Sequence, residues 1–569
     1  MTAAGALSGV ASMADVLAVE QTGDPGGQLV QRFDWSLAAA ISLLVAVIAI
    51  GVAISPRRAS VAFPNKRKVR GTGMRSVAGW PERPEQSEAT RLLCAAAYRD
   101  ERFANAVVEN LLADDLAAIA PSVGVDLRPV LLHCLASSKR RRDRDIGLTV
   151  TLLLSILLAL FSLGFVVIGL AVAGALVLSD QRWQHRTMSQ RLYRANFRRQ
   201  PNPPEPPESW VANRLADIAG AQQGNVTVYS GYRPFIGYGG SVSGWSFALP
   251  VLPVTELDGR RASKDVTPFT AAELTEHVHR ALSDVVDKSG AARIGERLEG
   301  LHLEERVFVD GAGLDVDGPF LLDREVSPTT SLSTDDLAAI AADPRGVARY
   351  YLCAHVPSWG GQIVASTFLR LSTDGHLLYA VCEHTVLAPV DAAYLPNERT
   401  TDKTRFRERA SAVGRSVRDV VPMLLLSPWR VIRVLDFPDR CARRADRARK
   451  QAVEDLDFDY GASFSVRESF TDDEYHNYYQ QADAIKHLKI VERHLLEAIA
   501  VFLEGHHVDT TELRNRQTAI LNEGIIQTGG TSNIGVQAVG RGAAAAQNSP
   551  DGASKPAAQN SPNVGAQKS

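Results

Sequence analysis

The chain contains 34 consecutive uncharged residues between Asp145 and Asp180, and arginines crowd both ends of this stretch. One straight helix of that length would extend roughly 50 Å, whereas the hydrocarbon core of a bilayer is about 30 Å thick. We therefore interpret residues 146–178 as a helical hairpin in a membrane. Its turn is expected at Phe161–Phe165, where Gly164 can adopt backbone angles that other residues avoid.

The charges that follow the hairpin support this interpretation. Six arginines and no acidic residue lie between Gln181 and Pro204. Basic segments beside membrane spans stay in the cytosol, so the chain is expected to return to the side from which it came. Each arm has only about 15 residues, roughly 23 Å, which is short for a bilayer. The sequence leaves open whether the hairpin crosses fully or is re-entrant.

A second apolar stretch lies nearer the N-terminus. Residues Trp35–Ile54 are 20 uncharged residues, enough to span a bilayer, with Trp35 at the edge as interfacial aromatic residues are. Acidic residues precede this stretch and basic residues follow it, which places the N-terminus outside and residue 56 onward in the cytosol. Neither apolar segment contains an ionisable residue, which is typical of anchors and not of coupled transporters.

At 569 residues the chain is long enough for several domains. We predict a membrane-anchored multidomain protein whose cytosolic α+β domain contains an antiparallel sheet. The expected segments in chain order are an extracytoplasmic N-terminal segment (1–34), a transmembrane helix (35–54), a cytosolic helical region (55–145), a transmembrane or re-entrant hairpin (146–178), a basic and proline-rich linker (179–208), the α+β domain (209–397), a basic membrane-proximal segment (398–465), a helical pair (466–524) and a disordered tail rich in Gly, Ala and Ser (525–569).

Local signals locate several elements of the α+β domain. Thr270 and Glu273 form a capping box at the start of an amphipathic helix, and Asp374-Gly375 predicts a two-residue turn between two strands. The glycines of "GYGGSVSGW" predict a loop or hairpin, because the Gly-Lys-Ser/Thr of a phosphate-binding loop does not follow them.

Two helices are predicted near the C-terminus. A capping box of Thr471 and Glu474 marks the start of the first, and the second runs from Asp509 to a stop before Gly524. Such a pair forms an antiparallel hairpin or an oligomerisation surface. We expect a protein partner or self-association through residues 474–524.

Two short patterns in the α+β domain raise the question of chemistry, Cys353-x-His355 and Cys382-x-His384. A thiol–imidazole pair can act as a cysteine nucleophile, and two pairs resemble the ligands of a Cys₂His₂ zinc site. In an ordinary meander, however, the first and third strands lie about 9–10 Å apart, too far to share one ion. We favour structural packing and assign no metal and no catalytic residue, because free cysteines are among the most buried residues. The chain's five cysteines lack paired spacing, which is typical of a reducing compartment.

One group of residues in the α+β domain is a candidate ligand-binding site, namely Tyr229, Tyr232, Arg233 and Trp245. This hypothesis requires a concave polar pocket beside them. No motif identifies a ligand, and no cofactor is expected.

A basic segment follows the α+β domain. Between Asp402 and Lys450 there are 14 Arg or Lys and 6 Asp or Glu, and an apolar run with Trp429, Arg430 and Arg433 is embedded among them. This pattern favours a segment that lies on anionic lipid headgroups. The alternative is a linker whose arginines are solvated and whose apolar run packs on the α+β domain. Nucleic acid is not an expected partner, because no base-stacking or groove-reading motif is present.

Three stretches of the sequence resemble an actinobacterial family of integral membrane proteins of unknown function. They are "ATRLLCAAAYRDERFANAVVENLL", "VTVYSGYRPFIG" and "ERHLLEAIAVFLEGHHVDTTEL", and the similarity extends over most of residues 85–540. The resemblance implies the same architecture and brings no active site with it.

The sequence therefore favours a membrane-anchored cytosolic interaction or sensor protein, at the cell membrane, without an evident catalytic site. One alternative is an enzyme that uses a Cys/His pair of the α+β domain. Another is a pore formed by oligomerised hairpins.

Overall fold

The computed structural model describes residues 87–522 with the exception of residues 163, 200–202, 208, 254–264, 288–297, 299, 317, 344–345, 396–419 and 473. The predicted N-terminal segment and transmembrane helix (1–54) and the tail (525–569) lie outside the described residues, as does the first part of the basic segment.

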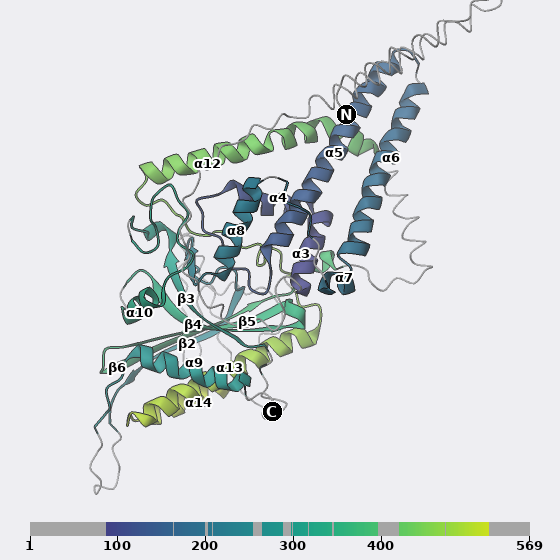
Figure 1. Cartoon of the computed structure of the whole chain (residues 1–569). Helices are drawn as coiled ribbons and strands as arrows, with labels where there is room; N and C mark the ends of the chain where they lie inside the picture. The colour runs from purple at the N-terminus through teal and green to yellow at the C-terminus, as the bar shows by residue number, and fades with distance from the viewer. Residues whose placement is uncertain are drawn as a thin grey trace, which may run out of the picture. The chain divides into compact units, whose positions relative to one another are not determined.

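A helical layer forms the first part of the described chain (Figure 1). It contains α3 (Glu88–Arg99), α4 (Glu101–Val108), the π-helix η2 (Glu109–Ala113), the start of α5 and α8 (Ser209–Gln223). Ser87 and Asp100 cap α3 and α4 by accepting hydrogen bonds from the backbone amides of Thr90 and Arg102. Apolar residues of all these helices share one buried cluster, so α8 packs with this layer although the sequence placed it in the α+β domain.

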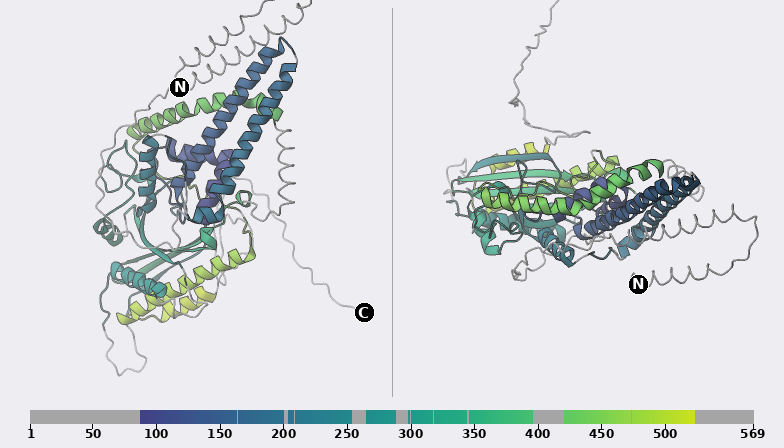
Figure 2. Two further views of the ribbon diagram at one scale, coloured as in Figure 1. Left: turned by 45° about the vertical axis from the view of Figure 1, so that its right-hand side comes forward. Right: turned by 90° about the horizontal axis from the view of Figure 1, so that it is seen from above.

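Helix α5 (Leu127–Ala159) continues out of this layer as one unbroken helix of 33 residues. The chain then turns and returns as α6 (Gly164–Arg186), which lies beside α5 (Figures 1 and 2). The π-helix η3 (Thr187–Arg191) and α7 (Arg194–Arg199) follow. The turn lies at residues 160–162 and overlaps the predicted Phe161–Phe165, but Gly164 is the first residue of α6 and does not have a positive φ.

The sheet has six strands in the order β1-β3-β4-β5-β6-β2. Their bounds are β1 Val226–Tyr229, β2 Gly240–Pro250, β3 His302–Asp310, β4 Arg349–Ser358, β5 Ile363–Thr373 and β6 Leu377–Leu387. Strands β3 to β6 and β2 pair antiparallel, but β1 pairs parallel with β3. The sheet is therefore mixed, and the prediction of an antiparallel sheet was wrong for its first strand. After β1 at one edge of the sheet the chain forms β2 at the opposite edge, and only then forms β3 beside β1. Local sequence patterns do not reveal this strand order.

Helices α9 (Ala271–Asp287), α13 (Tyr478–Gly505) and α14 (Thr511–Asn522) lie on one side of the sheet (Figure 1). Their apolar residues share a buried cluster with strands β2 and β4 to β6. The predicted capping box of α9 is confirmed. The Thr270 amide donates to the Glu273 carboxylate at 2.7 Å, and the Glu273 amide donates to the Thr270 hydroxyl at 3.2 Å.

Helix α13 does not begin at the predicted capping box. Asn477 is its N-cap and accepts from the Tyr479 amide, whereas Thr471 forms an isolated bridge with Val390. The tertiary pairing of Thr471 with the chain after β6 explains why the local capping signal failed. The apolar stripe of α13, including Leu488, Leu495 and Ile499, is buried against the sheet.

The turn between β5 and β6 lies at the predicted Asp374-Gly375, but three residues, 374–376, separate the strands and not two. Gly375 has a φ of +87°, and the Asp374 carboxylate accepts from the amides of His376 and Leu377. The remaining helices are the 3₁₀ turns η6 (Gly311–Gly313), η7 (Trp359–Gly361) and η8 (Ala392–Tyr394), α10 (Thr334–Ala342) and α12 (Phe437–Glu454). A further helix occupies residues 420–435, directly after the undescribed part of the basic segment.

Candidate functional site

The outer surface of the α5–α6 hairpin is apolar. Large apolar side chains on both helices and at the turn are exposed, namely Leu153, Ile156, Leu157, Leu160, Phe161, Val166, Val167, Ile168, Leu170 and Val172. Soluble proteins rarely expose a continuous apolar surface of this kind, and those that do use it to bind a partner or a membrane.

In the part of the chain that the structure describes, one helix has the length and the composition to cross a membrane. It runs from Gly164 to Arg191, through α6 and η3. One helix with these properties is weak support for a membrane location, since core helices of soluble proteins also have them. Such core helices are mostly buried, whereas only 22% of the most apolar window of this helix is buried.

Small residues allow α5 and α6 to approach closely. Gly169 on α6 is buried, and a Cβ added to it would collide with the hydroxyl of Ser155 on α5. Ala173 and Val177 continue the same face of α6, four and eight residues further on, and are also buried. Close contact through small residues is the usual way in which helices associate in lipid, where the hydrophobic effect does not drive them together.

An ion-pair cluster joins the two helices at the base of the hairpin. Asp180 on α6 is buried, and its carboxylate lies 3.0 Å from Nη1 of Arg144 and 3.3 Å from Nε of Arg140, both on α5. Arg144 also pairs with Asp145 at 2.8 Å. Asp145 and Asp180 are the two charges that bound the uncharged stretch, so the cluster marks the level at which the apolar part of the hairpin begins.

Helix 420–435 packs against the hairpin. Val420 and Leu424 share a buried cluster with Leu148 of α5 and with Ala173 and Val177 of α6. Its other face is exposed and apolar, with Val421, Leu425, Leu426, Trp429, Ile432 and Leu435. The helix is therefore amphipathic, and its outward face is next to the apolar surface of the hairpin.

The three predicted membrane-surface residues lie on this helix and differ in their surroundings. Trp429 is 60% exposed, and the guanidinium of Arg433 lies 5.0 Å from the centre of its ring. Arg430 is half-buried and is attracted electrostatically to Asp145. Trp429 and Arg433 are thus available to a membrane surface, whereas Arg430 belongs in part to the charge cluster of the hairpin.

The two Cys/His pairs lie on opposite faces of the sheet. The imidazole of His355 bonds to the Ser366 hydroxyl at 2.8 Å, and that of His384 bonds to the Thr367 hydroxyl at 2.9 Å. Ser366 and Thr367 are consecutive residues of β5, and consecutive strand residues point to opposite faces. The four residues therefore cannot bind one metal ion together.

Each pair is also inaccessible. Cys353 and Cys382 are fully buried, and burial raises the pKa of both thiols well above the ordinary value. Carboxylates nearby raise them further, Glu304 beside Cys353 and Glu492 beside Cys382. The Cys382 sulfur lies 3.7 Å from Nε2 of His384, but an activated thiolate needs the opposite electrostatic environment.

The structure adds Glu304 to the first pair. Ligand atoms of Glu304, Cys353 and His355 all lie within 4.8 Å of one another, which is compact enough for a metal ion. However, the Glu304 carboxylate already accepts from Nε of Arg306 at 2.9 Å and contacts Nε2 of His355 at 3.0 Å. A metal ion would have to break the contact between Glu304 and His355 and would face the Arg306 guanidinium. The donor set therefore fits a buried hydrogen-bond network better than a metal site.

A corresponding network surrounds His384 on the other face. Its Nε2 lies 3.3 Å from Oε1 of the buried Glu492 on α13, which also accepts from the Trp245 indole at 3.1 Å. Lys489 donates to the second oxygen of this carboxylate at 2.8 Å. Sequence reasoning missed Glu304 and Glu492, because each is more than 50 residues from its histidine and no local pattern links them.

The four candidate ligand-binding residues do not form one pocket. Tyr229 is on β1 and Trp245 is on β2, and these are the two edge strands of the sheet. Five strand spacings separate them, on the order of 24 Å. Tyr232 is 98% exposed, and Arg233 is exposed. Trp245 contributes to the Glu492 network instead.

The described chain is thus an α+β protein with a mixed six-stranded sheet and a protruding helical hairpin. Residues 244–535, just over half of the chain, match the AbeC-like domain, and the chain belongs to this family. The matched region begins within β2 and includes β3 to β6, helix 420–435 and the C-terminal helices, whereas the hairpin and β1 precede it. No curated protein and no solved structure matches the chain.

Proposed function

We propose that this protein is a membrane-anchored interaction or sensor protein in which the α5–α6 hairpin inserts into the bilayer. The exposed apolar surface of the hairpin carries this proposal. Transferring such side chains from water to hydrocarbon is favourable by about 25 cal/mol per Å² of apolar surface, so ten large exposed residues provide a strong driving force.

The position of the charges agrees with insertion from one side. From Asp145 to the turn and from the turn to Asp180 the helices each rise roughly 24 Å, most of the hydrocarbon thickness. All charged residues of the cluster lie at the base, and helix 420–435 lies beside that base with its apolar face outward. Helix 420–435 then rests in the interface, with Trp429 at the headgroup level.

The orientation follows from the basic residues. Arginines that follow α6 remain on the cytosolic side, so the sheet and the C-terminal helices are cytosolic and the N-terminus is outside. The AbeC-like domain then acts from the membrane surface as a recruitment or sensing module.

The enzyme alternative has less support, because both Cys/His pairs are buried without an accessible thiol. No observation favours the pore.

The test is to place a fluorescent probe at the hairpin turn. A single cysteine at Leu160, which is 81% exposed, carries an environment-sensitive dye in a Cys441→Ser background. A cysteine at Tyr232 is the matched control, since this residue is also highly exposed and lies in the sheet domain. In lipid vesicles we expect a blue-shifted emission and quenching by doxyl-labelled lipids at position 160 only.

Equal dye emission at positions 160 and 232 would contradict insertion. A protease-accessibility reporter after Arg199 tests the orientation separately. The proposal requires that this site be protected in intact cells and cleaved after the membrane is opened.

A further inference from the structure

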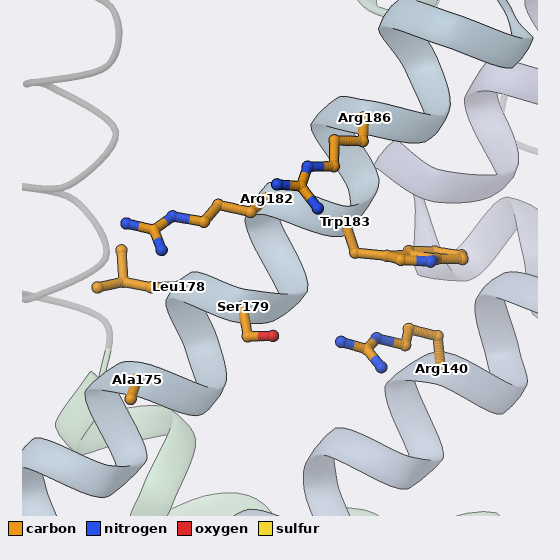
Figure 3. Close-up of a pocket in the computed structure, with 7 residues that line it drawn as sticks. All are labelled: Arg140, Ala175, Leu178, Ser179, Arg182, Trp183 and Arg186. Carbon is orange, nitrogen blue, oxygen red and sulfur yellow. The ribbon is translucent and has the colours of Figure 1, made fainter.

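A cationic pocket lies at the base of the hairpin, directly below its apolar part. It has a volume of about 410 Å³, and the residues that line it are Arg140, Ala175, Leu178, Ser179, Arg182, Trp183 and Arg186. Figure 3 shows Arg140 of α5 beside the Trp183 ring, with the other residues along α6. This pocket was not predicted from the sequence, which showed only that the region is basic.

Helical periodicity explains why these side chains lie together. Leu178, Arg182 and Arg186 are spaced by four residues and therefore follow one row along α6. Ala175, Ser179 and Trp183 form the neighbouring row with the same spacing. Both rows begin within the uncharged stretch and end beyond Asp180, so the pocket is apolar at one end and cationic at the other.

At the cationic end of the pocket, two arginines have no ion-pair partner among the described residues. Arg140 is shared between Asp180, at 3.3 Å, and the Trp183 ring, whose centre is 5.5 Å from the guanidinium carbon. Asp180 is already paired with Arg144 as well. Arg182 and Arg186 are exposed, and neither has a carboxylate at ion-pair distance among the residues that the structure describes. Two guanidinium groups with ten N–H donors between them thus line the pocket without a carboxylate partner in the described part of the chain.

This arrangement is suited to a phosphate group. Arginine recognises phosphate through paired N–H donors, and the Ser179 hydroxyl supplies a further polar group about one helical turn nearer the apolar end. If the hairpin is inserted as proposed above, Arg182 and Arg186 lie about 3 Å and 9 Å beyond Asp180 along the helix axis, in the headgroup region. The apolar walls of Ala175 and Leu178 then continue into the hydrocarbon.

We infer that this pocket binds the phosphate of an anionic phospholipid, with the acyl chains along the apolar side of α6. The inference rests on the proposed membrane insertion. It assigns to Arg182 and Arg186 a specific role beyond general attraction to a negative surface, and it makes lipid composition a signal that the hairpin conveys to the rest of the chain.

The test measures lipid selectivity of the full-length protein in neutral detergent micelles. Short-chain phosphatidylglycerol and short-chain phosphatidylcholine are titrated separately. Binding of each lipid to the protein is measured by thermophoresis. We expect phosphatidylglycerol to bind at least about tenfold more tightly than phosphatidylcholine, because its headgroup keeps a net negative charge, whereas the choline cation repels Arg182 and Arg186. Both lipids carry a phosphate, so the comparison isolates the effect of the choline cation, which leaves the headgroup of phosphatidylcholine without net charge.

Matched variants distinguish lipid binding in the pocket from a general effect of the protein's net charge. Arg182→Gln/Arg186→Gln should lose this preference, whereas Arg199→Gln/Arg447→Gln, which removes the same charge from exposed basic residues outside the pocket, should keep it. Arg182→Lys/Arg186→Lys should retain part of the affinity, because it preserves charge without the paired donors. Circular dichroism verifies that each variant is folded.

Three results would overturn the inference. The first is an equal loss of lipid selectivity in the two Gln double variants, and the second is no preference of the wild-type protein for phosphatidylglycerol. The third is displacement of the lipid by an equal concentration of inorganic phosphate, which would show that the pocket binds a soluble anion. Insertion is measured independently on neutral phosphatidylcholine vesicles by resistance to carbonate extraction. Failure there rejects the membrane anchor, whereas insertion without lipid selectivity rejects only the pocket.

Discussion

Arg144 on α5 and Asp180 on α6 form an ion pair, with 3.0 Å between Nη1 and Oδ2, at the base of the helical hairpin. Both side chains are largely buried, so the pair is shielded from solvent screening. The pair fixes the two helices at the level where the uncharged stretch begins and ends. Its removal is expected to loosen the hairpin at the point from which it would enter a membrane.

We predict that Asp180→Asn lowers the free energy of unfolding by about 3 kcal/mol, because Arg144 then keeps only Asp145 as a partner and Arg140 loses the same carboxylate. Chemical denaturation of the full-length protein in detergent measures this change. Asp143→Asn is the control, since Asp143 forms a 3.7 Å pair with Arg142 at the surface and is expected to matter by less than about 0.5 kcal/mol. Equal effects of the two substitutions would show that the pair does not hold the hairpin together.

A second prediction concerns the contact between α5 and α6. Gly169→Ala is expected to destabilise the hairpin by about 1–3 kcal/mol, because the new Cβ collides with the Ser155 side chain. Gly174→Ala provides the comparison on the same helix, since an added Cβ there meets nothing within 4 Å. That substitution should be neutral or stabilising by up to about 1 kcal/mol through helix propensity. Thermal melting in detergent distinguishes them, and the same melting shift for both would contradict this packing.

A third prediction is a pH dependence that originates at Glu304. Burial alone would raise the pKa of this carboxyl, but Arg306 and His355 outweigh burial and hold the pKa of Glu304 well below its usual range. The stabilisation is therefore present above the unfolded-state pKa of about 4.3 and is lost as the pH falls through the lower folded-state value. The difference in unfolding free energy between the wild-type protein and Glu304→Gln should shrink as the pH falls from about 6 to 3. Urea titrations at a series of pH values measure it, and a constant difference would exclude Glu304 as the source.

A fourth prediction distinguishes packing from thiol chemistry. Cys94, Cys134, Cys353 and Cys382 are buried, and Cys441 is half-buried. A maleimide reagent at pH 7.5 should therefore label Cys441 slowly in the native protein and all five thiols after denaturation. The Cys441→Ser variant should be unreactive when folded. Mass spectrometry of peptides identifies the labelled cysteines. Rapid labelling of Cys353 or Cys382 in the native protein would support the enzyme alternative.

Much of the local structure could be predicted from short patterns. The turn of the helical hairpin, the capping box of Thr270 and Glu273 and the hairpin at Asp374-Gly375 lie at or within one residue of the predicted positions, because each depends on residues a few positions apart. The capping signal at Thr471 failed, since a bridge to Val390 replaced the helical turn. Pairings between distant segments override local preference where the two compete.

The site was less predictable than the elements. Cys353 and Cys382 were correctly placed on strands, but neither the opposite faces of their pairs nor the carboxylates beside them follow from the sequence. Tyr229 and Trp245 are only 16 positions apart in the chain and yet lie on opposite edges of the sheet. Separation along the chain does not measure separation in a sheet whose second strand in sequence is its last in space.

The sequence by itself determined where this chain lacks charge. A run of 34 residues without a charge, bounded by Asp145 and Asp180, is a composition that any fold must accommodate. Tertiary structure decided what those boundary charges do. It brought Arg144 to Asp180 and set Arg182 and Arg186 around a pocket, because two helices that turn back on each other place residues 36 positions apart at the same height.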